Sequence, residues 1–184
     1  MIQLRKLTLR EIRLPLKEPF RISSGVVTER QILLVELESN DGERVWAESV
    51  ASERPNYTWE TIDTAWLALK EWVGPRVLGV PIDGPEQVHG LLEKDFRGHR
   101  MAKAAVEMGL WALAAEQDGI SLARRLGGER SSIPVGVSLG IQATPEALAQ
   151  KAAAAVRQGY RKIKLKIRPG SDIDFVAAVR YALP

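Results

Sequence analysis

The strongest structural constraint in this sequence is a short segment near its C-terminal end in which lysine and aliphatic residues strictly alternate. The segment reads Lys162-Ile163-Lys164-Leu165-Lys166-Ile167. Successive side chains of a β-strand point to opposite faces of a sheet, so a period of two predicts a strand with its lysines on one face. The aliphatic side chains then share the other face.

Two interpretations of this strand fit the alternation. In the first, the strand is half exposed and its lysines are solvated. In the second, it belongs to a (β/α) barrel, with the aliphatic face packed under helices and the lysines pointing into the barrel near its catalytic mouth. The flanks favour the second interpretation, because helical patterns at 145–158 and from Asp172 onward surround the strand, and a Pro169-Gly170-Ser171 turn follows it.

The composition is typical of a soluble globular protein and limits the classes of partner that we expect it to bind. The chain has 184 residues, 45% of them hydrophobic, and a formal net charge of +3. No basic run is interleaved with aromatic residues, so we expect no nucleic-acid partner. The chain has no cysteine, which excludes a thiol nucleophile or thiolate metal site and is consistent with a reducing cytoplasm. The N-terminus lacks the apolar core of a signal peptide, and no apolar run is long enough to cross a membrane.

The first part of the chain predicts a small antiparallel meander followed by helices. Pro15 and Pro19 are expected to break the first strand, and Ser39-Asn40-Asp41-Gly42 is a strong turn between the next two strands. We expect strands over 2–14, 31–38 and 43–50, polar loops over 20–29 and 51–57, and helices over 58–73, 83–96, 100–117 and 121–126. Thr58 is the expected N-cap of the first helix, and the tryptophans along it are expected in the core or a domain interface.

The second part predicts two βα units. The apolar run from Ile133 to Ile141 reads as a strand buried on both faces, and Thr144-Pro145 starts the helix that leads to the lysine strand. The fold class is therefore an α+β capping domain over 1–130, followed over 131–184 by the first βα units of a (β/α) barrel. Two units cannot close such a barrel, which typically needs about 250 residues.

This order of elements resembles the enolase superfamily, in its muconate-lactonising subgroup. Within that subgroup it is most similar to the o-succinylbenzoate synthase and N-succinylamino acid racemase family. The resemblance covers the whole chain and is carried by Pro19-Phe20-Arg21 with the following serines, by residues 98–108, by Val135 to Ile141, and by Ile163 to Ile167 with Pro169-Gly170.

The resemblance implies a reaction and a set of site residues. The family removes a proton α to a carboxylate and forms an enolate stabilised by Mg²⁺. Lys166 would be the acid/base lysine and Lys164 would lie beside the substrate carboxylate. The metal ligands, and a second catalytic lysine, would lie on later barrel strands, so none is assigned in this chain. The resemblance implies substrate contacts for Ser138 and for a capping loop that contains Phe20, Arg21, Ser23 and Ser24. The alternative interpretations are a small core residue for Ser138 and a solvated loop charge for Arg21.

Physical chemistry is consistent with the roles of the two lysines. A proton α to a carboxylate is very weakly acidic, so the enolate needs cationic neighbours as it forms. A lysine that acts as a base must lose its proton near neutral pH, and a nearby cation favours that loss. Two residues apart on one strand face, the amines of Lys164 and Lys166 are anchored about 6–7 Å apart.

Other conspicuous residues have simpler interpretations. His99 is expected to be a structural hydrogen-bonding residue between domains, His89 a surface residue, and Glu107 a buried structural partner. Tyr57, in a second capping loop over 51–57, is expected to be packed rather than in contact with a ligand. Asp172 and Asp174 are expected to cap the final helix rather than to bind a metal.

Three functional hypotheses follow. The first is a Mg²⁺-dependent o-succinylbenzoate synthase, which performs a syn dehydration in menaquinone biosynthesis, with N-succinylamino acid racemisation as a further activity on a small carboxylate substrate. The second is a dipeptide epimerase or muconate cycloisomerase. The third, of another class, is a non-catalytic piece that only binds or assembles. A homo-oligomer is compatible with all three, and we expect the isolated 184-residue chain to be inactive.

Overall fold

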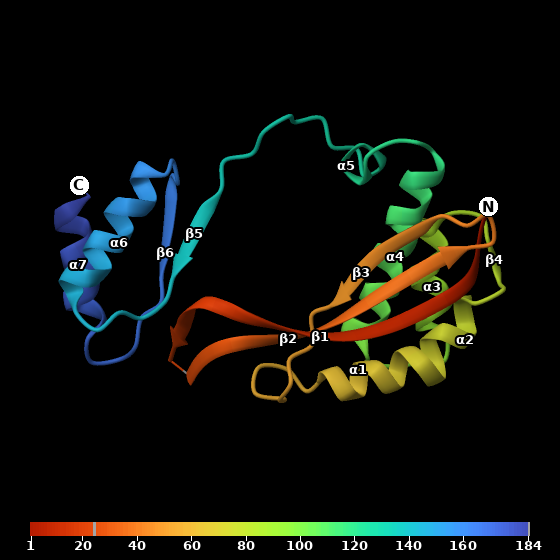
Figure 1. The fold of residues 1–184 in the computed structure, drawn as a ribbon, viewed down its shortest axis with the longest axis horizontal. Helices are drawn as coiled ribbons and strands as arrows, with labels where there is room; N and C mark the ends of the chain where they lie inside the picture. The colour runs from red at the N-terminus through yellow and green to blue at the C-terminus, as the bar shows by residue number, and fades with distance from the viewer. Residues whose placement is uncertain (24, 184) are drawn as a thin grey trace. The chain divides into compact units, whose positions relative to one another are not determined.

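A long hairpin opens the chain in the computed structural model, which describes residues 1–23 and 25–183. Its strands, β1 (Ile2–Ile22) and β2 (Gly25–Ser39), are neighbours in a four-stranded sheet of order β3-β2-β1-β4 (Figure 1). β3 (Arg44–Ser49) pairs antiparallel with β2, and β4 (Pro81–Ile82) pairs antiparallel with the first residues of β1. The predicted meander is therefore confirmed in type and order.

The predicted break at Pro15 and Pro19 is wrong, and so is the loop predicted over 20–29. β1 continues through both prolines, and β2 begins at Gly25. A proline removes one ladder donor, which a strand tolerates where that donor faces an unpaired side. Pro15 and Pro19 are four residues apart and thus lie on the same side of β1, whose second partner, β4, pairs only at Ile2 and Gln3.

The main core lies between this sheet and the helices that follow it. Leu33, Val35 and Leu37 of β2 are fully buried, at the spacing of two that places them on one face. The predicted helix over 100–117 is confirmed as α4 (Arg100–Gln117). α4 approaches the sheet at Gly109, where an added Cβ would meet Leu37 at 2.5 Å and Ala47 at 3.5 Å.

The helix predicted over 58–73 begins later and continues further than its sequence suggests. α1 (Ile62–Ala68) is capped by Thr61, whose side chain accepts a hydrogen bond from the Thr64 N–H in a capping box, so Thr58 is not the cap. A wide π-helical turn, η1 (Leu69–Val73), and α2 (Gly74–Val77) extend it. The wide turn ends two residues before Pro75, which has no N–H to donate in the α-helical register.

The tryptophans on this stretch are not core residues. Trp59 lies before the helix and is 79% exposed, while Trp66 and Trp72 are 36% and 41% exposed. The expectation of a core position is therefore wrong, whereas the alternative of a domain interface stays a prediction.

Three short helices complete this part of the chain. They are η2 (Pro85–Gln87), α3 (Val88–Glu93) and α5 (Leu122–Arg125), the last of which is capped by Ser121. The N-terminus of α4 is capped by a residue that is distant in the sequence. The buried carboxylate of Glu60 accepts hydrogen bonds from the N–H groups of Arg100 at 2.8 Å and Met101 at 3.0 Å. No helix in the described part of the chain is both long and apolar enough to cross a membrane.

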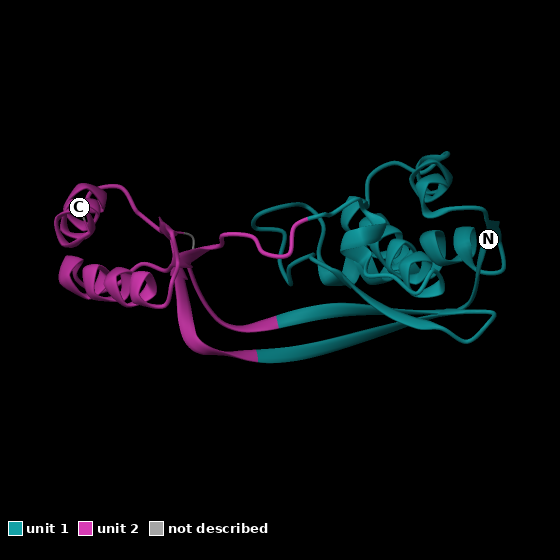
Figure 2. Cartoon of the chain, turned by 90° about the horizontal axis from the view of Figure 1, so that it is seen from above, with its two compact units in different colours: residues 1–14, 31–129 teal, residues 15–30, 130–184 magenta. Residues whose placement is uncertain are grey.

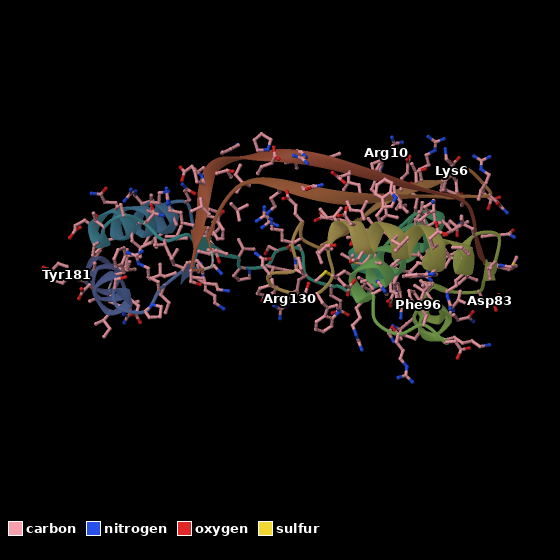
Figure 3. All side chains as sticks on the ribbon, turned by 90° about the horizontal axis from the view of Figure 1, so that it is seen from below. Lys6, Arg10, Asp83, Phe96, Arg130 and Tyr181 are labelled. Atoms are coloured by element: carbon pink, nitrogen blue, oxygen red, sulfur yellow. The ribbon has the colours of Figure 1, made fainter. Side chains whose placement is uncertain are left out.

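The C-terminal segment folds into the two expected βα units. They are β5 (Gly136–Leu139) with α6 (Pro145–Arg157), and β6 (Lys162–Leu165) with α7 (Asp172–Ala182). The prediction that β5 is buried on both faces is wrong, since Gly136 and Ser138 are exposed. α7 also keeps an exposed side, on which Tyr181 is 93% exposed (Figure 3).

The chain divides into two compact units that share the hairpin (Figure 2). The first unit comprises residues 1–14 and 31–129, and the second comprises residues 15–30 and 130–184. The tip of the hairpin, by which we mean residues 15–23 and 25–30, thus belongs with the βα units by its contacts. The domain boundary expected between residues 130 and 131 stays a prediction.

Candidate active site

The lysine strand is one half of a two-stranded parallel sheet. β6 pairs with β5 so that Lys164 is the partner of Ser138 and Lys162 is the partner of Gly136. Directly paired residues share a face of the sheet, so Ser138 and Lys164 lie on the same side. The N–H of Lys166 donates to the carbonyl of Leu139 at 3.0 Å, which extends the pairing beyond the end of β6.

The opposite face of this sheet is covered by helices. Leu139, Ile163 and Leu165 pack against a small buried cluster formed by Leu148 and Ala152 of α6 and Val179 of α7. The expectation that the aliphatic face packs under helices is therefore confirmed. In a (β/α) unit the face away from the helices is the interior face, and here it carries Ser138 and Lys164.

The lysine face is open in the described part of the chain. Lys162 and Lys164 are exposed, and Lys166 is half-buried. Among the placed residues, β5 and β6 form a sheet of their own, so the local structure is compatible with the solvated interpretation of the strand and also with the barrel interpretation. The roles of Lys164 and Lys166 consequently stay predictions.

The tip of the β1–β2 hairpin lies at the carboxyl end of β5. The carbonyl of Arg21 accepts the N–H of Ile141 at 2.9 Å, and Phe20 and Arg21 lie against Gly140. Phe20 is half-buried, whereas Arg21 and Ser23 are exposed. Ser24 lies outside the described residues. The second unit therefore brings Phe20 and Arg21 to the same strand ends as Ser138 and Lys166.

An ion pair joins the same hairpin to α6. Lys151 Nζ lies 2.5 Å from Glu18 Oε2, and the hydrogen bond and charge of Lys151 lower the pKa of the Glu18 carboxyl. Sequence reasoning missed Gly140, Glu18 and Lys151. No local signal marks them, because the partners are more than a hundred residues apart in the chain.

The second capping loop lies in the other compact unit. The structure leaves residues 51–57 without helix or extended strand, as expected. Tyr57 is 93% exposed, so the prediction that it is packed is wrong. A tyrosine in an irregular polar loop has no apolar neighbour from its own element to cover it, and none comes from elsewhere in the described chain.

The histidines and their neighbours depart from expectation in part. His89 is exposed as expected, but Glu107 is only half-buried, and its carboxylate lies 3.8 Å from His89 Nδ1. The buried Nδ1 of His99 has no hydrogen-bond partner among the described residues. The ring lies instead against Trp72 and Phe96, at centroid distances of 5.2 and 5.5 Å. His99 is thus an aromatic packing residue rather than the expected hydrogen-bonding one.

The described residues do not form a metal site of their own. Within 1–23 and 25–183, no group of three His, Cys, Asp or Glu side chains is arranged to hold a metal ion. Asp172 and Asp174 occupy the first turn of α7, and the N-cap position belongs to Ser171, so the expectation that the aspartates cap this helix is wrong in position. Their charges still suit the positive end of the helix dipole.

Residues 4–127 match the family model described as mandelate racemase / muconate lactonizing enzyme, N-terminal domain. The chain belongs to this family. The family is part of the enolase superfamily, so the capping-domain assignment made from the sequence is confirmed. The sheet and helices of the first compact unit lie within the matched range, apart from its terminal residues.

Relatives of known sequence and structure extend this assignment across the whole chain. An o-succinylbenzoate synthase from Geobacillus stearothermophilus is 41% identical over all of this chain and 48% of its own length. An N-succinylamino acid racemase from Thermus thermophilus is 43% identical over 96% of this chain and 47% of its own. A crystal structure of an enolase superfamily member from Listeria innocua superposes with a TM-score of 0.92 at 38% identity, covering 100% of this chain and 49% of that one. The chain therefore spans about half the length of the curated relatives it matches.

Proposed function

We propose that this chain forms the first half of an enolase-superfamily enzyme that removes a proton α to a carboxylate. Its reaction would be the dehydration that forms o-succinylbenzoate. The observation that carries the proposal is the parallel β5–β6 pair, whose helix-free face presents Ser138 beside Lys164, with Lys166 following at the carboxyl end. In barrels of this kind the catalytic side chains lie at the carboxyl ends of the strands.

Lys166 is the proposed acid/base residue. Its neutral amine takes the proton from the α-carbon of the substrate, and the electron pair of the broken C–H bond passes into the carboxylate as an enolate. Return of these electrons expels the hydroxyl group from the neighbouring carbon. In a syn elimination the same lysine faces that group, so the new ammonium of Lys166 donates the proton that turns it into water.

Lys164 and Ser138 are proposed to hold the carboxylate that becomes the enolate. An ammonium and a hydroxyl on one face place a charge and a hydrogen-bond donor where negative charge develops. A divalent metal would add to that stabilisation, and its ligands are expected on later barrel strands. We propose Mg²⁺ on the resemblance to the superfamily.

Racemisation of N-succinylamino acids is a second candidate activity. The observation that favours it is the 43% identity to the Thermus thermophilus racemase, slightly above the identity to the Geobacillus synthase. Dehydration, and racemisation of the enantiomer whose α-proton faces Lys166, begin with the same proton transfer to Lys166. They differ in whether the enolate expels a hydroxyl group or regains a proton from the opposite side.

The test is a lysine substitution in the complete enzyme. Lys166→Ala is expected to lower kcat for dehydration and for racemisation by about 10²–10⁴-fold, the usual contribution of a general acid/base, with little change in KM. Lys162→Ala is the matched control, because Lys162 lies on the same strand face at the amino end of β6, and it is expected to keep near-normal rates. Equal rates for Lys166→Ala and Lys162→Ala would remove Lys166 from its role.

A further inference from the structure

The hairpin tip packs closely against the α-carbon of Gly140, and we call this contact the seat of the hairpin. A Cβ added to Gly140 would lie 3.1 Å from the carbonyl oxygen of Arg21, 3.2 Å from the Arg21 nitrogen and 3.4 Å from Cδ2 of Phe20. Two of these three atoms belong to the backbone, which cannot rotate away as a side chain does. The hairpin therefore lies as close to β5 as it does because residue 140 has no side chain.

A backbone hydrogen bond fixes the hairpin at this seat. The N–H of Ile141 donates to the carbonyl of Arg21 at 2.9 Å, one residue beyond the glycine. On the other side, the carbonyl of Gly140 accepts the side-chain amide of Gln142 at 2.8 Å, so the backbone of this turn is satisfied locally. The side chains of Phe20 and Arg21 are left free by this bond, since only backbone atoms make it.

The Lys151–Glu18 pair links the same hairpin to α6. Lys151 lies on a helix that packs against β5, and Glu18 lies two residues before Phe20 on β1. Both side chains are substantially exposed, at 43% and 71%, and exposed ion pairs contribute little to stability. We therefore expect the pair to affect the lateral position of the hairpin on β5 more than the strength of its attachment.

We propose that Gly140 and the Lys151–Glu18 pair are positioning residues that seat the hairpin tip on β5 and so hold Phe20 and Arg21 over the carboxyl ends of β5 and β6. The part of this proposal that concerns substrate rests on the proposed function, whereas the seat itself does not. Loop closure over a site fixes substrate geometry only if the loop has a defined resting position, and the seat supplies one.

Amide hydrogen exchange of the 184-residue chain tests the seat directly. The reporter is the amide of Ile141, and the internal reference is the amide of Lys166, which donates to Leu139 in the same sheet. Gly140→Val is expected to accelerate exchange at Ile141 by about tenfold or more, the scale of one lost hydrogen bond, while exchange at Lys166 stays within a factor of about two. Gly140→Ala should fall between wild type and Gly140→Val.

Two further variants separate seating from folding. Gly90→Ala is the control substitution, because a Cβ at Gly90 meets nothing within 4 Å, and it should leave Ile141 exchange unchanged. Lys151→Glu should accelerate exchange at Ile141, and Lys151→Glu combined with Glu18→Lys should restore it. Unchanged exchange at Ile141 in Gly140→Val overturns the proposal, and so does equal acceleration at Ile141 and Lys166 in both Gly140→Val and Lys151→Glu.

Kinetics of the complete enzyme test the link to substrate. A displaced hairpin is expected to raise KM for Gly140→Ala several-fold with a smaller change in kcat, the opposite of the split expected for Lys166→Ala. If the proposed reaction is wrong, exchange at Ile141 still responds as described while no turnover is found. If only the seat is wrong, turnover is found and Gly140→Ala leaves both KM and Ile141 exchange at wild-type values.

Discussion

At the scale of single residues, the least expected group is the buried ammonium of Lys103. This side chain, on α4, is 4% exposed, and its Nζ donates to Glu93 at 2.9 Å and to the carbonyl of Phe96. The ammonium also lies 4.4 Å from the ring centroid of Phe96, which stacks with His99. Lys103 therefore links α4 to the side chain of the last residue of α3 and to the aromatic residues that lead into α4.

The stability of the first compact unit at acid pH should depend on the Lys103–Glu93 pair. The hydrogen bond from Lys103 holds the pKa of Glu93 below its ordinary value of 4.5. A lowered carboxyl pKa contributes stability that is present above pH 4.5 and is lost as the pH falls through the lowered pKa. Lys103→Met should therefore show a smaller loss of unfolding free energy between neutral pH and about pH 3 than the wild type.

Urea unfolding followed by tryptophan fluorescence measures this loss, since all five tryptophans lie within residues 31–129. Lys94→Met, at an exposed neighbouring lysine, should keep the wild-type pH dependence. The pKa values of Glu38 and Glu43 are also lowered, by Arg5 and Ser39 respectively, so part of the acid loss remains in every variant. An unchanged pH dependence in Lys103→Met would contradict the assignment.

At the scale of secondary-structure elements, the decisive contact is that of α4 with the sheet. Alanine content and periodicity predict this helix well. Its position on β2 and β3 depends on Gly109, whose missing side chain leaves room for Leu37 and Ala47. The outer face of the same sheet is polar, with Arg10 paired to Glu36 at 3.0 Å and lying over Trp46 (Figure 3). One face of the sheet thus carries the core and the other faces solvent.

A double-mutant cycle on this contact has a definite expected sign. Leu37→Ala should cost about 2–5 kcal/mol by opening a cavity in the core. Adding Gly109→Ala to that variant should restore about 1 kcal/mol, because the new methyl group occupies vacated space and alanine favours the helix. Gly109→Ala alone should gain less than this, since its methyl group meets Leu37. Strict additivity, measured by urea unfolding, would show that the two side chains do not compete for the same space.

At the scale of the whole molecule, the described residues form the capping sheet with its helices and two strands of barrel type. It spans 48% of the Geobacillus relative. The lysine face of β5 and β6 is open, and the described residues lack a metal-binding cluster. A proton-abstraction site needs both a closed environment and a stabilising charge opposite the base.

The isolated 184-residue chain is therefore expected to show no turnover with Mg²⁺ on succinylated substrates. The measurement is an assay of this chain beside the complete enzyme at equal concentration. Folding of the isolated chain is checked by the exchange protection of the Lys166 amide, so that inactivity is not mistaken for unfolding. Dehydratase activity from the chain alone would show that its own residues complete a site.

Sequence alone determined the elements whose signals are local. Alternation in residues 162–167 specified β6, Thr144-Pro145 specified the start of α6, and the alanine-rich periodicity specified α4, because each depends on the periods and caps of a single segment. The family resemblance was likewise readable from short motifs.

Tertiary structure decided what depends on residues distant in the chain. It carried β1 through two prolines, capped α4 with Glu60, and packed His99 against the rings of Trp72 and Phe96, with no partner for its Nδ1 among the described residues. It also placed the Arg21 carbonyl on Ile141 and seated the hairpin on Gly140. The physical reason is that these partners are fixed by packing and edge availability, which no local pattern of residues encodes.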